Sequence, residues 1–284
     1  MSKATPLMQQ YWSLKCEYPD TLLFIQVGDF FELLFDDAKK ASAFLGIALT
    51  KRGRHEGEDI PLCGVPVHAI DHYLAKLVKG GFCVALCEQL EQAVPGKMVK
   101  RGITRVLTPG TLTEGSLLNA GAPSYILSFV PHEDSWGLLF AELMTAQLYA
   151  TSITAGSLKS LETELARFFP DEIILDAQQA DTFQSLFKKQ GYFTSLVASD
   201  QSGMASWAQQ QLHEAAYKQV QANKALEQAL SALYAYLKKN NEAALHAFNA
   251  LHFYEPDDYM VLDAASLRNL EIIKNNQDSS SVHT

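Results

Sequence analysis

The sequence predicts an α/β protein of two domains. Its 284 residues, 48% of them hydrophobic, suffice for about two compact cores. Apolar runs of strand length alternate with segments whose apolar residues recur at helical spacing. A small and polar stretch, residues 115–123, lies between two such regions and is the predicted linker.

The first predicted element is a β-hairpin. The apolar run 22–27 has strand length, and the Gly-Asp pair at 28–29 suits a two-residue turn because glycine readily adopts positive φ. Successive side chains of the following strand point to opposite faces. Phe30 and Glu32 therefore share one face, and Phe31 takes the other.

Two helices and two strands complete the first domain. The first helix is indicated by the spacing of Leu34, Ala38, Ala41 and Leu45, with two aspartates at 36–37 where the helix dipole favours anions. A second helix is predicted over 69–79, with Gly80 as its stop. Strands are predicted over 82–87 and 103–107, which makes a small mixed α/β unit.

The second domain begins with three closely spaced strands. They are predicted over 125–130, 136–141 and 147–153, and their short connections favour an antiparallel meander. A helix over 158–168 with Ser157 as N-cap, a strand over 172–175 and a helix over 181–189 follow. One long amphipathic helix over 215–239 is predicted from the spacing of Leu226, Leu230, Leu233 and Leu237.

Composition narrows the class of protein. The chain has no run of 18 or more apolar residues and no apolar leader at its start, so we expect a cytoplasmic location. All four cysteines precede residue 90. Cys83 and Cys87, on one predicted strand, would lie roughly 13 Å apart at about 3.3 Å per residue, too far to share a zinc ion. We expect reduced core thiols.

The net charge of −9 is unevenly distributed. Residues 1–115 carry 13 Lys/Arg and 13 Asp/Glu, whereas residues 116–284 carry 10 and 19. A nucleic-acid surface would therefore belong to the first domain. Because that domain is only neutral, its nonspecific affinity for phosphates should be weak.

Phe30 and Glu32 have two interpretations. A Phe-rich strand is commonly core, and a single Glu in it can be an edge charge that discourages aggregation. Alternatively, because burying an unpaired carboxylate is costly, the pair lies at a surface and recognises a ligand.

Ordered motifs around this pair favour recognition. They are GDFFEL at 28–33, DDAK at 36–39, LTKRG at 49–53, PLCGVPVH at 61–68 and TPGT at 108–111. In order and spacing they resemble the N-terminal part of MutS-family DNA mismatch-repair proteins. The resemblance runs from about Pro6 to Ile273 and is densest before Gly115.

The resemblance implies three regions. Residues 1–115 would be the mismatch-recognition domain, 116–254 the connector domain, and 255–284 the start of the lever and core domain, so that we expect the chain to be a truncated form of a longer protein. Three strands followed by helix, strand and helix are similar to the ribonuclease-H-like connector of the family. Two-metal nucleases of that fold need convergent carboxylates, and the predicted first strand has none. We therefore interpret the connector as noncatalytic.

The resemblance also implies site residues. Phe30 aligns with the aromatic that stacks on a mismatched base, and Glu32 with the carboxylate that contacts the base. Lys51 and Arg52 could contact phosphates, or form a solvated basic loop. His68 is a weaker candidate for a phosphate contact, and a helix N-cap or a core position is the favoured role for it. Where the family often has Tyr and Met, this chain has Phe31 and Val27, which leaves the two motif positions unchanged.

Two alternatives remain open. The chain could be a protein-interaction module that relays to repair partners without binding DNA. It could also be a metal-dependent hydrolase, since His68 and His72 have i, i+4 spacing, although Ala69 stands where such motifs have Glu and no third ligand is evident.

Cofactors and partners follow from the resemblance. No Gly-x-x-x-x-Gly-Lys-Ser/Thr phosphate loop occurs, so the ATP and Mg²⁺ of the family are expected outside this chain, and we expect no catalytic residues and no metal here. The implied partners are mismatched duplex DNA, a second copy in the full-length family and a downstream repair factor at the connector. The implied location is the cytoplasm, in association with the nucleoid.

Overall fold

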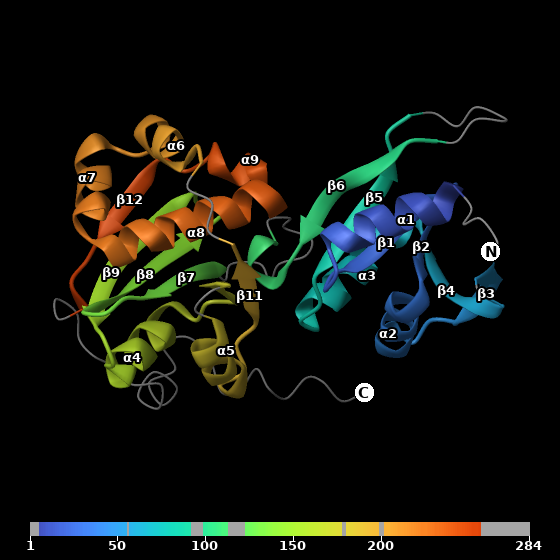
Figure 1. Ribbon diagram of the computed structural model, residues 1–284, viewed down its shortest axis with the longest axis horizontal. Coiled ribbons are helices and arrows are strands. Elements are labelled where there is room, and N and C mark those ends of the chain that lie inside the picture. Colours follow the sequence, from blue (N-terminus) through green and yellow to red (C-terminus); the bar gives the residue numbers. More distant parts are fainter. Residues whose placement is uncertain are drawn as a thin grey trace. The chain divides into compact units, whose positions relative to one another are not determined.

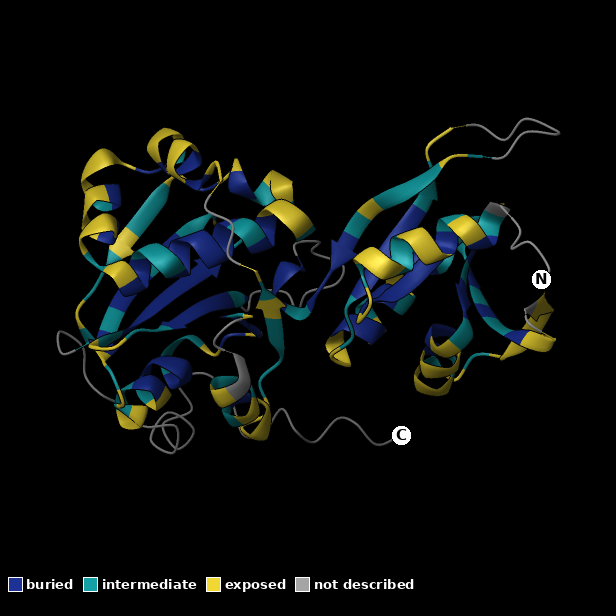
Figure 2. Cartoon of the chain, in the orientation of Figure 1, coloured by how far each residue is buried: buried dark blue, intermediate teal, exposed yellow. Residues whose placement is uncertain are grey.

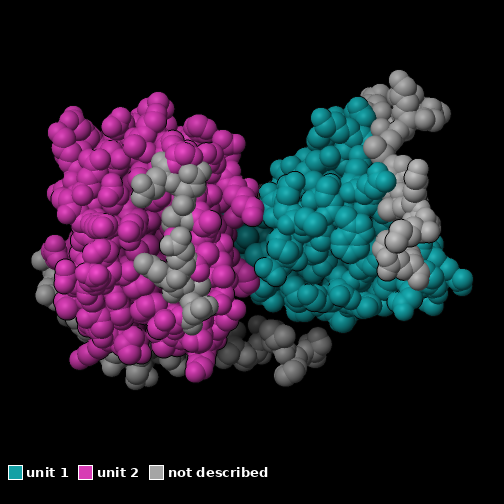
Figure 3. Space-filling model, viewed as in Figure 1, with its two compact units in different colours: residues 1–122 teal, residues 123–284 magenta. Residues whose placement is uncertain are grey.

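The chain forms two compact units. The computed structural model describes residues 6–55, 57–91, 99–112, 123–177, 180–198 and 202–256. Contacts divide the chain into residues 1–122 and 123–284, which Figure 3 colours separately. The boundary predicted between residues 115 and 116 lies outside the described residues, as does nearly all of the predicted region 255–284.

The first unit is built on a six-stranded mixed sheet in the order β3-β4-β2-β1-β5-β6 (Figure 1). Its strands are β1 Leu22–Val27, β2 Phe30–Leu34, β3 Thr50–His55, β4 Glu58–Pro66, β5 Val84–Gln89 and β6 Arg101–Leu107. The predicted hairpin is confirmed, because β1 and β2 are antiparallel with Val27 opposite Phe30 and with Gly28 at φ 62°. The sequence analysis assigns no strand to β3 or β4, whose glycines, prolines and charges hide the period-two pattern.

Helices cover both faces of this sheet. They are α1 Pro6–Glu17, α2 Phe35–Leu45 and α3 Ile70–Lys79, with short 3-10 turns η1 Val67–Ala69 and η2 Pro109–Thr111. The hydrophobic cluster between the sheet and α2 and α3 includes Phe31 and Leu33 of β2. The cluster between the sheet and α1 includes Leu34 of the same strand. The helices predicted around residues 34–45 and 69–79 are confirmed. The sequence analysis does not predict α1.

Asp37 fixes α1 against the sheet. Its buried carboxylate accepts from Lys15 Nζ of α1 at 2.8 and 2.9 Å and from the Leu23 backbone N–H of β1 at 3.0 Å. Removing one partner of a buried ion pair leaves an uncompensated charge, which is strongly destabilising. Asp37 therefore does more than favour the start of α2, since it joins a helix, a strand and a second helix.

The second unit is a mixed sheet in the order β11-β10-β7-β8-β9-β12. Its strands are β7 Tyr125–Pro131, β8 Ser135–Glu142, β9 Gln147–Thr154, β10 Glu172–Asp176, β11 Thr194–Val197 and β12 Ala250–Phe253. The predicted meander is confirmed, because β7, β8 and β9 are antiparallel neighbours. β10 adds in parallel to β7, and β11 to β10, as the ribonuclease-H-like architecture requires. The sequence analysis does not predict β11 or β12.

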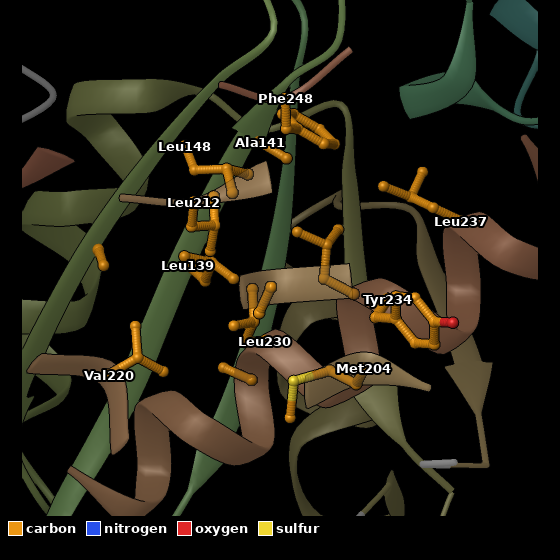
Figure 4. Close-up of a cluster of buried hydrophobic side chains, with 14 of the residues drawn as sticks. Leu139, Ala141, Leu148, Met204, Leu212, Val220, Leu230, Tyr234, Leu237 and Phe248 are labelled. Atoms are coloured by element: carbon orange, nitrogen blue, oxygen red, sulfur yellow. The ribbon is translucent and has the colours of Figure 1, made fainter. Parts of the chain in front are cut away.

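Two layers of helices bury this second sheet. On one face lie α4 Leu158–Phe168 and α5 Ala180–Lys189, and on the other lie α6 Met204–Gln211, α7 Glu214–Ala222 and α8 Lys224–Asn240, followed by α9 Glu242–Leu245. Figure 4 shows Leu139 and Leu148 of the sheet in one cluster with Leu230 and Tyr234 of α8. Strand β8 is buried along nearly its whole length, in dark blue in Figure 2.

The prediction of one long helix over 215–239 is wrong. The chain leaves helical geometry at Asn223, with φ −119° and ψ 110°, and continues as α8. The Asn223 side chain accepts from the backbone N–H groups of Ala225 and Leu226 at 3.0 and 3.2 Å. Asparagine is a strong N-cap, so this local hydrogen bonding ends α7 and starts α8. The leucines that suggested one long helix all lie within α8.

Close packing sets the position of α8. A Cβ atom added to Gly137 on β8 would lie 2.6 Å from the Ala225 carbonyl carbon and oxygen. Ser128, central on β7 and fully buried, donates from Oγ to the Ala229 carbonyl oxygen at 2.8 Å. The first turns of α8 therefore lie directly on the sheet.

The expectation of core thiols is confirmed only in part, because Cys63 and Cys87 are buried whereas Cys16 is exposed and Cys83 is partly buried. All four cysteines, including the buried Cys63 and Cys87, are free. Cys83 precedes β5 rather than sharing the strand with Cys87, so the predicted strand over 82–87 lies two residues too early. Among the described residues, no helix combines the length and apolar character needed to cross a membrane.

Candidate nucleic-acid interface

Phe30 is the first residue of β2 and lies on the surface. Its side chain is 48% exposed, whereas the adjacent Phe31 is 1% exposed in the core beneath α2 and α3. The tight turn at Gly28 places Phe30 at the end of the hairpin, opposite Val27 on β1 and Pro66 on β4. The ring is therefore held by a strand of the sheet and remains outside the hydrophobic core.

Glu32 shares the face of Phe30, as predicted from the strand period. Leu34, two residues further along the same face, is buried in the core of α1, and Tyr11 of α1 donates from its hydroxyl to the Leu34 carbonyl oxygen at 3.4 Å. Burial along β2 thus decreases from the buried Leu34 through the largely buried Glu32 to the exposed Phe30. The cover provided by α1 ends before the hairpin turn.

Arg52 neutralises the Glu32 carboxylate. Its Nη1 donates to both carboxylate oxygens at 2.6 Å, with side-chain exposures of 50% for Arg52 and 14% for Glu32. Strand β4 lies between the two strands that carry these residues, and its residue opposite Glu32 is Gly64. Because glycine has no side chain, Arg52 can reach Glu32 across β4.

The predicted basic pair Lys51 and Arg52 lies on a strand, not in a loop. The β3–β4 pairing shifts register between Lys51 and Arg54, and Gly53 within this irregularity has φ 68°. Lys51 and Arg54 bind Asp59 of β4 at 2.9 and 3.2 Å, and these hydrogen bonds hold the pKa of Asp59 below its usual value. Arg52 thus has a different partner, Glu32, from the two basic residues on either side of it in β3.

His68 is exposed and lies in η1, directly after β4. The Val67 backbone N–H donates to the Asp29 carbonyl oxygen at 2.9 Å, so the start of η1 is attached to the hairpin turn. The structure therefore brings the segment of His68 next to the turn that carries Phe30. No group of three His, Cys, Asp or Glu side chains suited to a metal ion occurs in the described part of the chain, which leaves His68 and His72 without a third ligand there.

The sequence analysis missed the connection between Glu32 and Arg52. The two residues are 20 positions apart, and their pairing depends on two strands that the sequence pattern does not reveal. The sequence contains only partial evidence of this ion pair: a carboxylate in an apolar strand, a basic pair further along the chain, and Gly64. The arrangement can present an aromatic ring and a carboxylate to one ligand while a guanidinium compensates the negative charge.

Family models match both units. The model described as MutS domain I matches residues 5–116, and the model described as MutS domain II matches residues 124–249. Together they account for most of the chain.

Curated relatives agree with these matches. Proteins named DNA mismatch repair protein MutS from Carboxydothermus hydrogenoformans and Wolbachia pipientis wMel are 35% and 36% identical over 98% and 95% of this chain, and the chain covers 32% and 33% of their own lengths. A relative of the same name from Ruegeria sp. (strain TM1040) is 46% identical over 60% of the chain and 20% of its own length. The chain thus spans about a third of the length of the first two relatives.

Proposed function

The chain belongs to the MutS family of DNA mismatch-repair proteins, and from this premise we propose that its first unit recognises mismatched or unpaired bases in duplex DNA. One observation carries the proposal: a half-exposed Phe30 at the end of a rigid hairpin shares its face with Glu32.

Phe30 acts as the wedge. Proteins that insert an apolar side chain from the minor groove unstack a base step at a cost of a few kcal/mol, and the cost is lower where pairing is already defective. The ring recovers roughly 1–3 kcal/mol by stacking on a base, and it does so on any base. Mismatched sites are therefore preferred because they deform more easily.

Glu32 supplies discrimination. A carboxylate repels phosphates, so at a DNA surface it is useful only where it gains a specific hydrogen bond from a base N–H. Lys51, Arg52 and His68 would contact phosphates and fix the register of the protein on the duplex. These contacts carry no sequence information, which suits a protein that must detect mismatches in any sequence.

The second unit is proposed as the noncatalytic connector to a downstream repair factor. On its first strand, β7, the buried Ser128 donates to the backbone of α8 and thereby holds the helix on the sheet. In the longer protein we expect self-association and an ATPase that uses Mg²⁺. The residues of this chain do not fit ATP and Mg²⁺, because no phosphate loop occurs among its 284 residues. No step of nucleotide hydrolysis is therefore assigned to it.

Fluorescence anisotropy with labelled duplexes tests the proposal. The 284-residue chain is titrated at low ionic strength, where phosphate contacts are strongest, into a matched duplex and into the same duplex with one mismatch. We expect tighter binding to the mismatched duplex and loss of this preference in Phe30→Ala. One stack of about 1–3 kcal/mol corresponds to about 5- to 150-fold in Kd.

Phe44→Ala is the matched control. Phe44 is 47% exposed, close to the 48% of Phe30, but it lies on α2, where its ring packs against Phe82. It should keep the mismatch preference. Retained preference in Phe30→Ala, or a folded chain that binds neither duplex, would contradict the proposal, and the second result would favour the protein-interaction module.

A further inference from the structure

The Arg52–Glu32 ion pair lies within the proposed recognition surface, and its geometry is unusual for a phosphate-binding arginine. Both hydrogen bonds to the Glu32 carboxylate come from one nitrogen, Nη1, at 2.6 Å. Nε and Nη2 of the guanidinium are not used by Glu32. Arg52 is half exposed, so these donors can meet a second anion without leaving the surface.

The contact is selective within β3. Three basic side chains occur at 51, 52 and 54, and two of them bind Asp59. Only Arg52 is directed across β4, where Gly64 leaves the space open between β3 and Glu32. The β3–β4 register is irregular between Lys51 and Arg54, the stretch that contains Arg52.

Neutralisation of Glu32 has a consequence for DNA binding. A bare carboxylate beside Phe30 would repel the phosphates of every duplex, whereas a paired carboxylate presents little net charge. A guanidinium makes charge-assisted hydrogen bonds to carboxylates and phosphates alike, so the half-exposed Arg52 can exchange the carboxylate for a phosphate. The pair can therefore be closed on matched DNA and open where a base offers Glu32 a hydrogen bond.

We propose that Arg52 is a positioning residue for Glu32. In the free protein and on matched DNA, Arg52 masks the Glu32 carboxylate; when a mismatched base binds Glu32, Arg52 transfers to a phosphate. The inference rests on the proposed function and deepens it. No bond is made or broken beyond hydrogen bonds. The phosphate gains the guanidinium donor, and both carboxylate oxygens of Glu32 are released, so that one of them can accept from a base N–H.

A double-mutant cycle on matched DNA separates masking from a simple phosphate contact. If Arg52 masks Glu32, R52Q weakens binding to the matched duplex by about two- to fivefold, the range expected for one exposed charge pair. In an E32Q background the same change should have a clearly smaller effect, that of the phosphate contact alone, because no charge remains to mask. R52K keeps a positive charge and should recover part of the loss.

The control is R54Q. Arg54 is the same residue type on the same strand, but its partner is Asp59 rather than Glu32. Its effect on matched-duplex affinity should be the same with Glu32 and with E32Q. Equal effects of R52Q in both backgrounds, like those of R54Q, would overturn the masking role.

Arginine-selective NMR follows the release directly. In the free chain and with matched DNA, the Arg52 guanidinium signals should show restrained rotation that disappears in E32Q, and mismatched DNA should shift them to a new environment. Unrestrained signals in the free chain, or identical signals with both duplexes, would contradict the inference. If the effects of R52Q and E32Q are additive and the chain still prefers mismatched DNA, only this inference is refuted. If the chain has no preference for mismatched DNA, the proposed function is refuted, and this inference is refuted with it.

Discussion

Truncation of two adjacent phenylalanines tests the central structural premise. Phe31→Ala removes a ring that is 1% exposed in the core beneath α2 and α3. Such a change costs about 3–5 kcal/mol of unfolding free energy, from lost burial and the cavity left behind. Phe30 is 48% exposed. Full burial of a Phe contributes about 1.5–3 kcal/mol, so truncation of this half-buried ring should cost only about 1 kcal/mol.

Hydrogen exchange measured by mass spectrometry gives these free energies for the first unit alone. Amides of β1 lie at the centre of its sheet, between β2 and β5, and should exchange through opening of the whole unit. At 1.4 kcal/mol per factor of ten, Phe31→Ala should accelerate their exchange by about 150-fold or more, and Phe30→Ala by about fivefold. Equal acceleration by the two variants would place the Phe30 ring in the core and would refute its availability to DNA.

Four further outcomes are expected. Glu32→Ala should blur discrimination while preserving or raising affinity for matched duplex, because the acceptor for a base N–H is lost while Arg52, released from its ion pair, is free to bind a phosphate; equal losses on both duplexes in anisotropy titrations would contradict this. Gly137→Ala should lower the urea midpoint of the second unit by an amount equivalent to about 1–3 kcal/mol, because a Cβ 2.6 Å from helix backbone atoms cannot be accommodated without movement. Asn223→Ala should cost about 1 kcal/mol in the same assay through loss of two cap hydrogen bonds. Burial raises the pKa of the Cys63 thiol from 9.0 to about 11, so at pH 8 it carries about 100-fold less thiolate than it would at its ordinary pKa, and it should react with a thiol reagent much more slowly than the exposed Cys16; equal labelling rates would contradict its burial.

Local sequence determined the hairpin and the orientation of the proposed wedge. The run 22–27, the glycine of the turn and the two-residue period of a strand place Phe30 and Glu32 on one face before any tertiary contact is known. The α4 cap and the meander of β7, β8 and β9 are likewise encoded within short segments. These features depend on residues only a few positions apart.

Tertiary structure alone decided which part of that face stays accessible. The face carries both the buried Leu34 and the exposed Phe30, and the difference arises because α1, fixed by the ion pair of Lys15 with Asp37, covers one end of β2 and not the other. The partner of Glu32 is also a tertiary outcome, since Arg52 reaches it across a strand that local periodicity does not predict. Coverage and charge pairing both depend on segments distant in sequence, whose approach is set by packing of the whole unit, whereas alternation along a strand is fixed by backbone geometry.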